Sequence, residues 1–536
     1  MRGLMQHDEL VLTRILERAV TYSPRQQIVT KTPGGVERRT YEEFGERVGR
    51  LANALKELGV GPGDRVGSFG FNTGRHLELY FGVPCMGAVL HTLNIRLHPE
   101  QIAWIANHAE DKVVVVDEAL LPVFAKIAPH LSTTQHIVVM GTPADADGQL
   151  DYDTMLEAAS PEFAWPDLEE DDASSICYTS GTTGNPKGVV YSHRSMVLHA
   201  WMINLAQNLG VTERDAVLPV VPMFHANAWG LPYAAAMAGA KQVFAGQFSA
   251  DPASLSDLVE SEKVTLLAGV PTVWIGLLQY LEQNPRDFSS VTRITAGGSA
   301  VPVSLIERFK RQLGVEMVQG WGMTETGPVA SLSMLPPEMD DLPEAERFRM
   351  RAKQGRVVPG ISLRVVAEDG TVVPWDNKSM GEVQVKGNWV AASYYNDPTG
   401  DERFADGWLR TGDVAVVDDH GFMQLVDRTK DLVKSGGEWI SSVELESAMM
   451  GHPAVLEAAV IGVFSEQWSE RPLACVVLKP GASATPDELI AHLATQFPKW
   501  WLPDEVVFIE EVPKTSVGKF DKKVLREDFK NHPLPT

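Results

Sequence analysis

Residues 178–188 combine glycines, hydroxyls and a lysine in a pattern that suits a polyanionic ligand. The segment reads Tyr-Thr-Ser-Gly-Thr-Thr-Gly-Asn-Pro-Lys-Gly. Its three glycines let the backbone turn tightly and aim N–H groups into a concavity, while four hydroxyls and Lys187 supply donors for phosphate oxygens. The spacing Gly-x4-Gly-Lys-Ser/Thr is missing, so the segment is not a Walker A loop. It predicts a phosphate-binding loop, and a flexible polar surface loop is the alternative interpretation.

A second segment, residues 319–326, sets an aromatic ring beside a hydroxyl and a carboxylate. Glu325 offers a hard oxygen ligand for Mg2+, and the Thr179 hydroxyl from the first segment is a candidate second ligand. Thr324 can donate to a phosphate oxygen, and Trp321 offers a flat apolar face for a nucleobase. In another sequence context, Trp321 would be interpreted as a core aromatic. Together the two segments indicate chemistry at phosphorus, which depends mainly on charge neutralisation and alignment.

The elements around these segments predict an α/β fold. From residue 112 onward, short β-branched runs alternate with helical patterns, which indicates mostly parallel sheets covered by helices. Residues 361–417 are dense in strands and turns and predict a β-rich subdomain of hairpins. The pattern then changes to a compact α+β unit. We therefore expect a large N-terminal domain at residues 1–427 and a small C-terminal domain at residues 428–536.

The composition is that of a globular protein with more than one domain. The 536 residues exceed what one hydrophobic core organises, and 44% are apolar and 22% charged. A net charge of −23 argues against a nucleic-acid partner. The three cysteines, Cys85, Cys177 and Cys475, lack disulfide or zinc spacing, so a reducing, cytoplasmic location is expected. The N-terminus has no apolar region typical of a secretion signal, and no uncharged stretch is long enough for a transmembrane helix.

The segment at 178–188 resembles the phosphate-binding loop of the adenylate-forming superfamily, which contains acyl-CoA synthetases, peptide-synthetase adenylation domains and firefly luciferase. Other segments resemble the remaining motifs of this family, in order and over essentially the whole chain. They are Gly-Gly-Ser-Ala at 297–300 (adenine-lining turn), Gln-Gly-Trp-Gly-Met-Thr-Glu-Thr at 319–326 (adenine and Mg2+), Trp-Leu-Arg-Thr-Gly-Asp at 408–413 (ribose), Asp-Arg-Thr-Lys-Asp at 427–431 (hinge), Lys-Ser-Gly-Gly-Glu-Trp-Ile at 434–440 (CoA-facing turn) and Pro-Lys-Thr-Ser-Val-Gly-Lys at 513–519 (catalytic lysine).

The resemblance implies two half-reactions that use ATP, Mg2+ and coenzyme A. A carboxylic acid first becomes an acyl-adenylate, with Lys519 bridging the carboxylate and the α-phosphate. The C-terminal domain, which is mobile in this family, then rotates about Asp427. Lys519 leaves, and the Gly436-Gly437 turn arrives, where small residues let the CoA thiol pass closely. A solvated basic helix is the alternative interpretation of the region around Lys519.

The resemblance also assigns roles to individual residues. The implied catalytic residues are Lys519, Thr324, Glu325 and His225, and the implied metal ligands are Thr179 and Glu325. The implied ATP or AMP site comprises Thr179, Ser180, Gly181, Thr182, Thr183, Gly184, Lys187, Gly298, Ser299, Gln319, Gly320, Trp321, Thr324, Asp413, Arg428, Lys430, Lys434 and Trp439. The implied CoA-facing residues are Lys434, Gly436, Gly437 and Glu470, with a solvated lysine as the alternative interpretation of Lys434.

The acid is expected to bind between residues 223–233, residues 270–274 and the residues after Glu325. The first two segments carry no acidic residue, whereas peptide-synthetase adenylation domains usually place an aspartate in the first to hold an ammonium group. An aliphatic acid is therefore favoured over an amino acid. The expected pocket residues are His225, Trp229, Gly230, Trp274, Gly327 and Pro328. A core histidine is the alternative for His225, and Trp229 is either a gate for the acyl chain or a fixed core tryptophan.

Within the family, the sequence most resembles medium- and long-chain fatty-acid–CoA ligases. A ligase for a short thioether acid, such as 3-(methylthio)propionate, is the alternative. A luciferase-type oxygenase shares all the motifs but adds a second activity. A non-enzymatic acyl-ligand-binding protein would be expected to lack Lys519 or Glu325, and both are present. The expected partners are therefore a fatty acid, ATP and CoA, and a homodimer is expected only by analogy with relatives.

Overall fold

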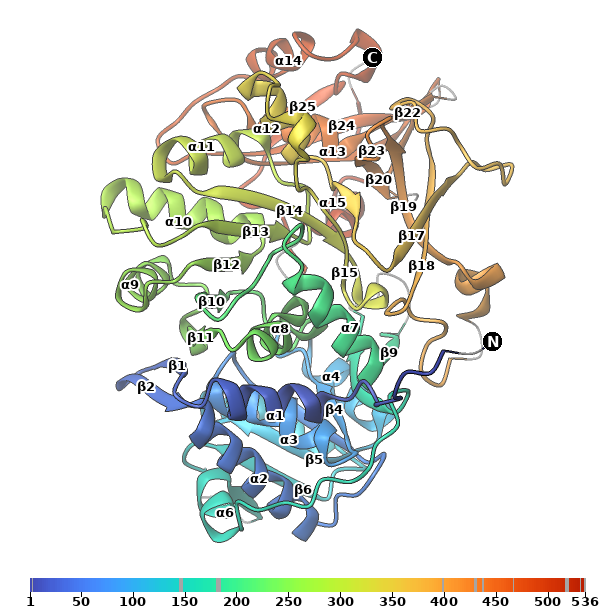
Figure 1. Cartoon of the computed structure of the whole chain (residues 1–536). Coiled ribbons are helices and arrows are strands. Elements are labelled where there is room, and N and C mark those ends of the chain that lie inside the picture. Colours follow the sequence, from blue (N-terminus) through green and yellow to red (C-terminus); the bar gives the residue numbers. More distant parts are fainter. Residues whose placement is uncertain are drawn as a thin grey trace.

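The computed structural model describes residues 1, 3–143, 148–179, 185–397, 400–428, 431–435, 438–465, 467–515, 520–530 and 532–534. Two large sheets form the N-terminal part, with helices between them and on their outer faces (Figure 1). A small antiparallel sheet follows, and a separate α+β unit ends the chain. The predicted fold class is confirmed.

The first large sheet has the strand order β16-β15-β14-β13-β12-β10-β11-β1-β2. The strands from β14 to β1 in this order run parallel, while β15, β16 and β2 pair antiparallel at the edges. The bounds are β1 (Gln27–Thr32), β2 (Gly35–Thr40), β10 (Ala216–Pro219), β11 (Lys241–Phe244), β12 (Leu266–Gly269), β13 (Arg293–Gly297), β14 (Glu316–Gly322), β15 (Val329–Leu332) and β16 (Arg356–Val357).

The second large sheet has the order β7-β6-β5-β3-β4-β8-β9 and is parallel except for β9. The valine run at 113–116 in β5 is fully buried, as a strand covered on both faces requires. The bounds are β3 (Arg65–Phe69), β4 (Val89–Thr92), β5 (Asp111–Asp117), β6 (His136–Met140), β7 (Gln149–Asp151), β8 (Ala173–Tyr178) and β9 (Gly188–Ser192).

Helices fill three layers around these sheets. The layer between the sheets contains α1 (Leu12–Tyr22), α2 (Tyr41–Glu57), α3 (Gly74–Cys85), α6 (Tyr152–Ala158), α7 (His193–Asn204) and α8 (Leu231–Ala238). The outer face of the first sheet is covered by α9 (Pro252–Glu262), α10 (Pro271–Gln283), α11 (Val303–Leu313) and α12 (Glu344–Arg351). The outer face of the second is covered by α4 (Pro99–Ala109) and α5 (Leu121–Phe124). Local sequence sets helix starts: Thr40 and Glu43 form a capping box at α2.

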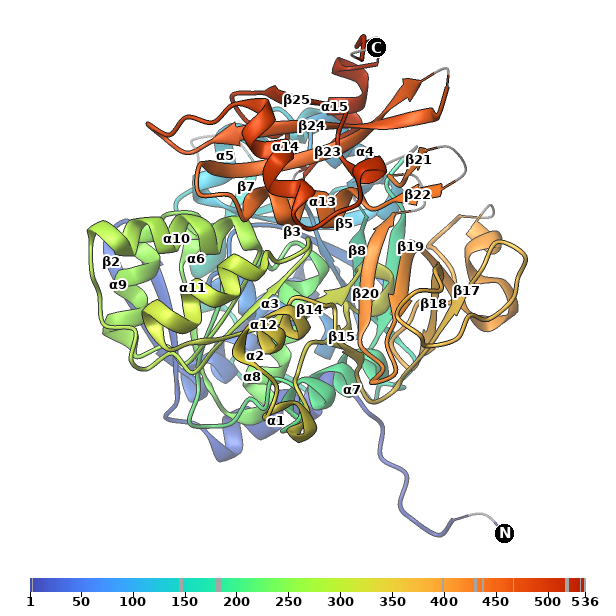
Figure 2. The same ribbon diagram turned by 90° about the horizontal axis from the view of Figure 1, so that it is seen from above.

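The chain then forms an antiparallel sheet and the C-terminal unit. The sheet contains β17 (Ile361–Val366), β18 (Gly381–Gly387), β19 (Leu409–Val417) and β20 (Met423–Arg428). The C-terminal unit contains β21 (Val433–Ser435), β22 (Glu438–Ile440), α13 (Ser442–Met450), β23 (Val455–Ser465), β24 (Ser469–Leu478), α14 (Pro486–Ala494), β25 (Glu505–Phe508) and α15 (Lys522–Asp528). It has its own apolar cores and lies over one end of the N-terminal part (Figure 2). β20 ends at Arg428, the residue at which the second domain is predicted to begin, and the boundary itself stays a prediction.

Short 3-10 segments of three to eight residues complete the described chain. They are η1 (Glu118–Leu120), η2 (Ala128–His130), η3 (Ala226–Gly230), η4 (Gly246–Phe248), η5 (Thr324–Thr326), η6 (Pro337–Met339), η7 (Gly400–Gly407) and η8 (Lys499–Trp501). Within the described ranges, every helix is too short or too polar to cross a bilayer.

Candidate active site

A cavity of about 310 Å3 lies where the carboxyl ends of several strands meet. Thr179 directly follows β8, Gly298 directly follows β13, and Glu325 comes shortly after β14. Ligands of open α/β sheets usually bind in such a crevice. The predicted site residues that line this cavity are Thr179, Lys187, His225, Trp229, Gly298, Gly320, Trp321, Thr324, Glu325, Pro328 and Arg428. The topology thus brings together motifs that are far apart in sequence.

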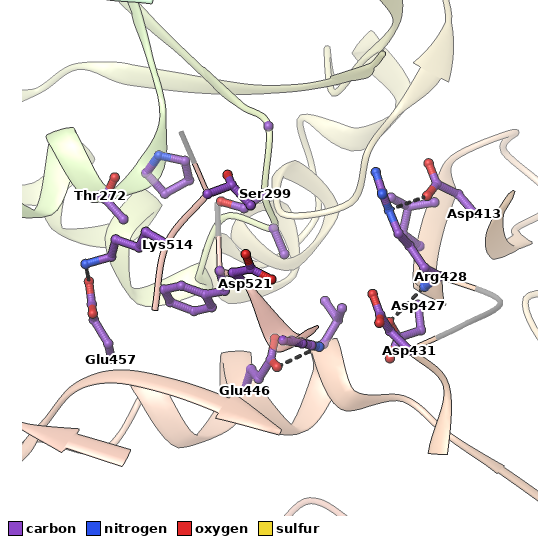
Figure 3. Close-up of a pocket in the computed structure, with 18 of the residues that line it drawn as sticks. Thr272, Ser299, Asp413, Asp427, Arg428, Asp431, Glu446, Glu457, Lys514 and Asp521 are labelled. Atoms are coloured by element: carbon purple, nitrogen blue, oxygen red, sulfur yellow. Dashed lines mark hydrogen bonds and ion pairs between the residues drawn. The ribbon is translucent and has the colours of Figure 1, made fainter. Parts of the chain in front are cut away.

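A second cavity, of about 540 Å3, lies between the N-terminal part and the C-terminal unit. It shares Gly298, Gly320, Trp321 and Arg428 with the first cavity, so the two are neighbours. The other predicted residues along it are Ser299, Gln319, Asp413 and Asp427. Lys514 of the C-terminal unit also lines this cavity, and Figure 3 shows its ammonium directed at Glu457, with 2.7 Å between Nζ and Oε1.

Trp321 of the predicted adenine motif and Asp413 of the predicted ribose motif are in direct contact. The indole nitrogen of Trp321 donates to Oδ2 of Asp413 at 2.8 Å. Oδ1 of the same carboxylate lies 3.3 Å from Nε of Arg428, which pairs with Asp413 across β19 and β20. Trp321 was expected to offer only a flat face, but the structure also assigns its N–H to the orientation of the carboxylate. The buried side-chain oxygen of Gln319 accepts from the Val301 amide and so supports the preceding turn, and its role toward the nucleotide stays a prediction.

Glu325 lies buried in η5, and its contacts come from a segment that sequence reasoning missed. The Tyr394 hydroxyl donates to Oε1 of Glu325 at 2.5 Å, and Nη1 of Arg403 lies 3.4 Å from the same oxygen. Arg403 also donates to the Tyr394 hydroxyl at 2.8 Å. Tyr394 and Arg403 follow β18 in a stretch without a helix or strand period, so the only sequence signal was an aromatic and a basic residue near a turn. The Thr324 carbonyl accepts from the Tyr191 hydroxyl at 2.7 Å.

Thr179 and Lys187 close the base of the predicted phosphate loop. The Thr179 amide donates to the Lys187 carbonyl at 2.9 Å, and the Lys187 amide donates to the Thr179 hydroxyl at 3.3 Å. The Lys187 ammonium lies 2.8 Å from Oδ2 of Asp397 and 4.8 Å from the centre of the Tyr394 ring. The end of the loop at Lys187 therefore lies beside Tyr394, whose hydroxyl donates to Glu325.

Residues 226–229 form an unusual turn on the opposite wall of the cavity. All four have a positive φ, between 43° and 58°, although none is glycine. The left-handed region costs a non-glycine residue about 1–2 kcal/mol, so the surrounding structure must hold this turn. Asn227 is the anchor: its buried amide donates to the Ser175 hydroxyl at 3.1 Å, and its carbonyl accepts from Tyr80 at 3.4 Å. The turn presents the half-buried Trp229 to the cavity, with its ring against Gly297.

Trp274 corrects the predicted acyl pocket. Its side chain is fully buried in the core under α9, α10 and α11, on the outer face of the first sheet. It packs against β12 so closely that a Cβ at Gly269 would come within 2.5 Å of the ring. The helical pattern of α10 could not show which side of the helix faces the ligand. Its neighbours Thr272 and Ile275 line the interdomain cavity instead.

Gly230 and Gly327 are also behind the cavity wall rather than part of its lining. Gly230 has φ 73°, and a Cβ there would lie 2.5 Å from Nδ1 of His199, so glycine is needed for packing. Gly327 has φ 76° and abuts Trp389. Both were expected to contact the acyl group, but neither residue lines the cavity. Pro328, His225 and Trp229 remain in contact with the cavity.

The carboxylate of the predicted hinge residue, Asp427, is hydrogen-bonded to the end of β20 and to the start of α13. Oδ1 of Asp427 accepts from the Arg428 amide at 2.8 Å, and Oδ2 accepts from the Ser442 amide at 3.1 Å at the start of α13. The predicted CoA-facing pair is elsewhere, since the Lys434 amide donates to Glu470 at 2.9 Å and neither residue lines either cavity. The structure therefore does not bring Lys434 and Glu470 to the other site residues.

Residues 16–395 match the family model described as AMP-binding enzyme, and residues 444–519 match the AMP-binding enzyme C-terminal domain. The chain belongs to the AMP-binding enzyme family. The long-chain-fatty-acid–CoA ligase of Thermus thermophilus is 50% identical over 533 residues, which are 98% of this chain and 97% of that protein. The medium-chain-fatty-acid–CoA ligase of Ectopseudomonas oleovorans is 43% identical over 535 residues, 99% and 98% of the two chains. The crystal structure of the anthranilate CoA ligase AuaEII with anthranoyl-AMP has a TM-score of 0.88 and 26% identity, and the match covers 98% of this chain and 99% of that one.

In this AMP-binding enzyme, the residues present fit a magnesium ion carried by a nucleotide. The described part of the chain holds no group of three or more His, Cys, Asp or Glu side chains that could bind a metal without help. Glu325 is instead a single buried carboxylate beside the base of the phosphate loop. Mg2+ commonly keeps waters and takes one or two carboxylates together with substrate phosphates, so this donor set suits it.

Several predicted residues of the AMP-binding enzyme lie outside the described part. They are Ser180, Gly181, Thr182, Thr183, Gly184, Lys430, Gly436, Gly437 and Lys519. The backbone of Trp439 belongs to β22, and its side chain is outside the described part. The roles expected for these residues stay predictions.

Proposed function

We propose that this AMP-binding enzyme is an ATP-dependent fatty acid–CoA ligase. It forms an acyl-adenylate with release of pyrophosphate and then transfers the acyl group to CoA with release of AMP. One observation carries the proposal. A single cavity joins Thr179, Thr324 and Glu325, which suit Mg·ATP, to an uncharged wall around Trp229, which suits an acyl chain. The relatives of highest similarity described above are named as fatty-acid–CoA ligases.

The lining of the cavity favours an aliphatic acid over an amino acid. Among the described residues that line it, Glu325 is the only carboxylate, and it is engaged by Tyr394 and Arg403. A substrate ammonium group buried there would lack a counter-charge, which is costly. The wall beyond Trp229 is apolar and includes Leu231 and Val329. We therefore propose medium- to long-chain fatty acids as substrates.

The catalytic roles follow the two half-reactions. In the first, Lys519 offsets the charge that develops between the carboxylate and the α-phosphate, Thr324 donates to the phosphate, and His225 lines the carboxylate side. The position of Lys514 supports this role, because it precedes Lys519 by five residues in the chain and lines the interdomain cavity with Ser299. The ribose hydroxyls donate to Asp413, and Arg428 donates to the ribose.

The second half-reaction requires another placement of the C-terminal unit. Lys434 and Glu470 line neither cavity, so this arrangement suits adenylation rather than thioester formation. Rotation about Asp427 would remove Lys519 and bring the Gly436-Gly437 turn to the acyl-adenylate. The fully buried free cysteines also support a reducing, cytoplasmic location. Homodimer formation is proposed by family analogy, and light scattering after size-exclusion chromatography would test it.

Pyrophosphate release measured across straight-chain acids from acetate to palmitate, with and without CoA, tests the function. We expect the highest kcat/KM for acids between octanoate and palmitate. Without CoA, each enzyme molecule should form one acyl-adenylate and release one pyrophosphate, and continued turnover should require CoA. Parallel assays with 3-(methylthio)propionate and with amino acids separate the alternatives. A preference for the thioether acid would replace the proposed substrate class, and pyrophosphate release with amino acids alone would contradict the ligase assignment.

A further inference from the structure

Residues 391–397 connect Glu325 to the end of the phosphate loop. The Ala391 amide donates to the Glu325 carbonyl at 2.8 Å, and the Tyr395 amide donates to the Gly188 carbonyl at 2.8 Å. The segment is therefore fixed at one end to the backbone of Glu325, the candidate metal ligand, and at the other to the backbone of Gly188, which follows Lys187. Nothing in the two half-reactions as proposed above uses this segment.

Tyr394 lies at the centre of this connection. Its hydroxyl donates to Oε1 of Glu325, and its ring lies beneath the Lys187 ammonium and against the edge of Phe404, 5.2 Å away between ring centres. The ring is almost fully buried, so its orientation is determined by packing. In the described part of the chain, the side-chain contacts of Glu325 all fall on Oε1. This leaves Oε2 for a metal ion and sets the direction in which it points.

Arg403 differs from the other two cations of the cavity because its counter-charge, Glu325, is the candidate metal ligand. Among the described lining residues, three carry a fixed positive charge: Lys187, Arg403 and Arg428. Lys187 is paired with Asp397 at 2.8 Å, and Arg428 is paired with Asp413 at 3.3 Å. Arg403 lies 3.4 Å from Glu325 and is 43% exposed, values close to those of Arg428, which is 44% exposed. When Glu325 takes a metal ion, Arg403 loses the charge that balances it.

We propose that Tyr394 is a positioning residue for the Glu325 carboxylate and that Arg403 is a further contact for the phosphates of ATP. Without nucleotide, Arg403 neutralises Glu325 and holds the Tyr394 hydroxyl in place. When Mg·ATP binds, the metal ion occupies Glu325 and the guanidinium turns to the phosphate oxygens, for which its fork of donors is suited. The inference rests on the proposed Mg·ATP site and adds two residues that no motif includes.

Two variants test the proposal, Tyr394→Phe and Arg403→Gln, and Tyr395→Phe and Lys386→Gln serve as matched controls. Calorimetric titration with ATP, with and without Mg2+, measures binding in the absence of turnover. Tyr394→Phe should reduce the gain in affinity that Mg2+ provides by about tenfold, because the carboxylate is no longer oriented. Arg403→Gln should weaken Mg·ATP binding by about tenfold, and AMP binding by less, because AMP carries fewer phosphate oxygens. Arg403→Lys should restore part of the loss.

Kinetics and stability separate this role from a purely structural one. Arg403→Gln should raise KM for Mg·ATP with little change in KM for the acid, and thioester formation from supplied acyl-adenylate should keep its rate. Equal losses of rate in both half-reactions, together with a lowered Tm, would show that residues 391–397 have only a structural role. Wild-type Mg·ATP affinity in both variants would overturn the inference. A Glu325→Ala variant shows which idea fails: if it also keeps normal Mg·ATP binding, the proposed metal site itself is wrong.

Discussion

The indole nitrogen of Trp321 and the carboxylate of Asp413 meet at 2.8 Å across 92 residues of sequence. This contact joins the end of β14 to β19, so the wall expected to face adenine and the carboxylate expected to face ribose are set by one hydrogen bond. The base and the sugar of a nucleotide are covalently joined. A site in which the groups that receive them are already fixed relative to each other does not have to order those groups on binding.

Asp413→Ala should therefore damage both stability and nucleotide binding. The buried Trp321 N–H would lose its acceptor, which costs about 1–3 kcal/mol of unfolding free energy. KM for ATP should rise by about tenfold or more because the ribose contact is lost as well. Thermal unfolding and ATP-dependent pyrophosphate release measure the two effects. Asp419→Ala, at an 84% exposed aspartate in the next turn, is the control and should change neither.

Lys519→Ala should lower adenylate formation by orders of magnitude. A preorganised charge contact in a transition state is worth roughly 3–4 kcal/mol. ATP–pyrophosphate exchange measures this step, and thioester formation from supplied acyl-adenylate should be retained far better. Loss of both half-reactions to the same extent would contradict the account with two domain placements.

Gly437→Leu should have the opposite pattern. A leucine side chain would obstruct the approach of the CoA thiol, while ATP–pyrophosphate exchange should stay near the wild-type rate. Overall acyl-CoA formation is the readout that should fall. If the variant forms acyl-CoA at a normal rate, Gly436 and Gly437 are only a turn.

Trp229→Ala and Trp274→Ala form a matched pair. Trp229 lines the cavity and is half-buried, so its loss should cost little stability and should change the ratio of kcat/KM between octanoate and palmitate. Each methylene admitted to an apolar pocket is worth up to about 0.8 kcal/mol. Trp274 is fully buried in the core, so its loss should cost about 3–5 kcal/mol and leave the chain-length profile unchanged. The reverse outcome would make Trp229 the core residue.

Acid pH should weaken the anchoring of Glu262. Although burial by itself raises the pKa of this carboxyl, hydrogen bonds and charges from Arg38 and Lys241 lower it to about 2. The ionised form therefore stabilises the fold above the ordinary value of 4.5, and this contribution disappears as pH falls from 4.5 toward 2. Glu262→Gln should be less stable than wild type in urea at pH 6, and the difference should narrow at pH 4 and below. Glu57→Gln, at an exposed site, should show no such narrowing.

The sequence predicted those parts of the site that lie in contiguous segments. Thr179, Lys187, Thr324 and Glu325 are adjacent to glycines and strand ends that carry a recognisable pattern, and the structure brings them to one cavity. Tyr394 could not be found in this way, because its contact with Glu325 spans 69 residues and depends on how β18 and β19 are connected.

Packing explains the other differences from expectation. Trp229 and Trp274 look alike in sequence, each in an apolar segment next to small residues, and only the packing of α10 on β12 separates the two. The left-handed backbone at residues 226–229 could not be predicted from the sequence either, because none of these residues is glycine and buried contacts impose the conformation. The pairing of β1 with β11 could not be predicted either, because no local pattern indicates which distant strands become neighbours in a sheet.

The left-handed turn at residues 226–229 gives the enzyme a position at which the range of substrates can change while the fold is kept. Asn227 secures the backbone from the core side through Ser175 and Tyr80, whereas Trp229 is the member that meets the cavity. Because Asn227 anchors the turn and Trp229 lines the cavity, substitutions at position 229 should alter the shape of the pocket without removing the contacts that hold the turn. Acyl selectivity is in this sense modular, and its evolution can proceed separately from the evolution of stability.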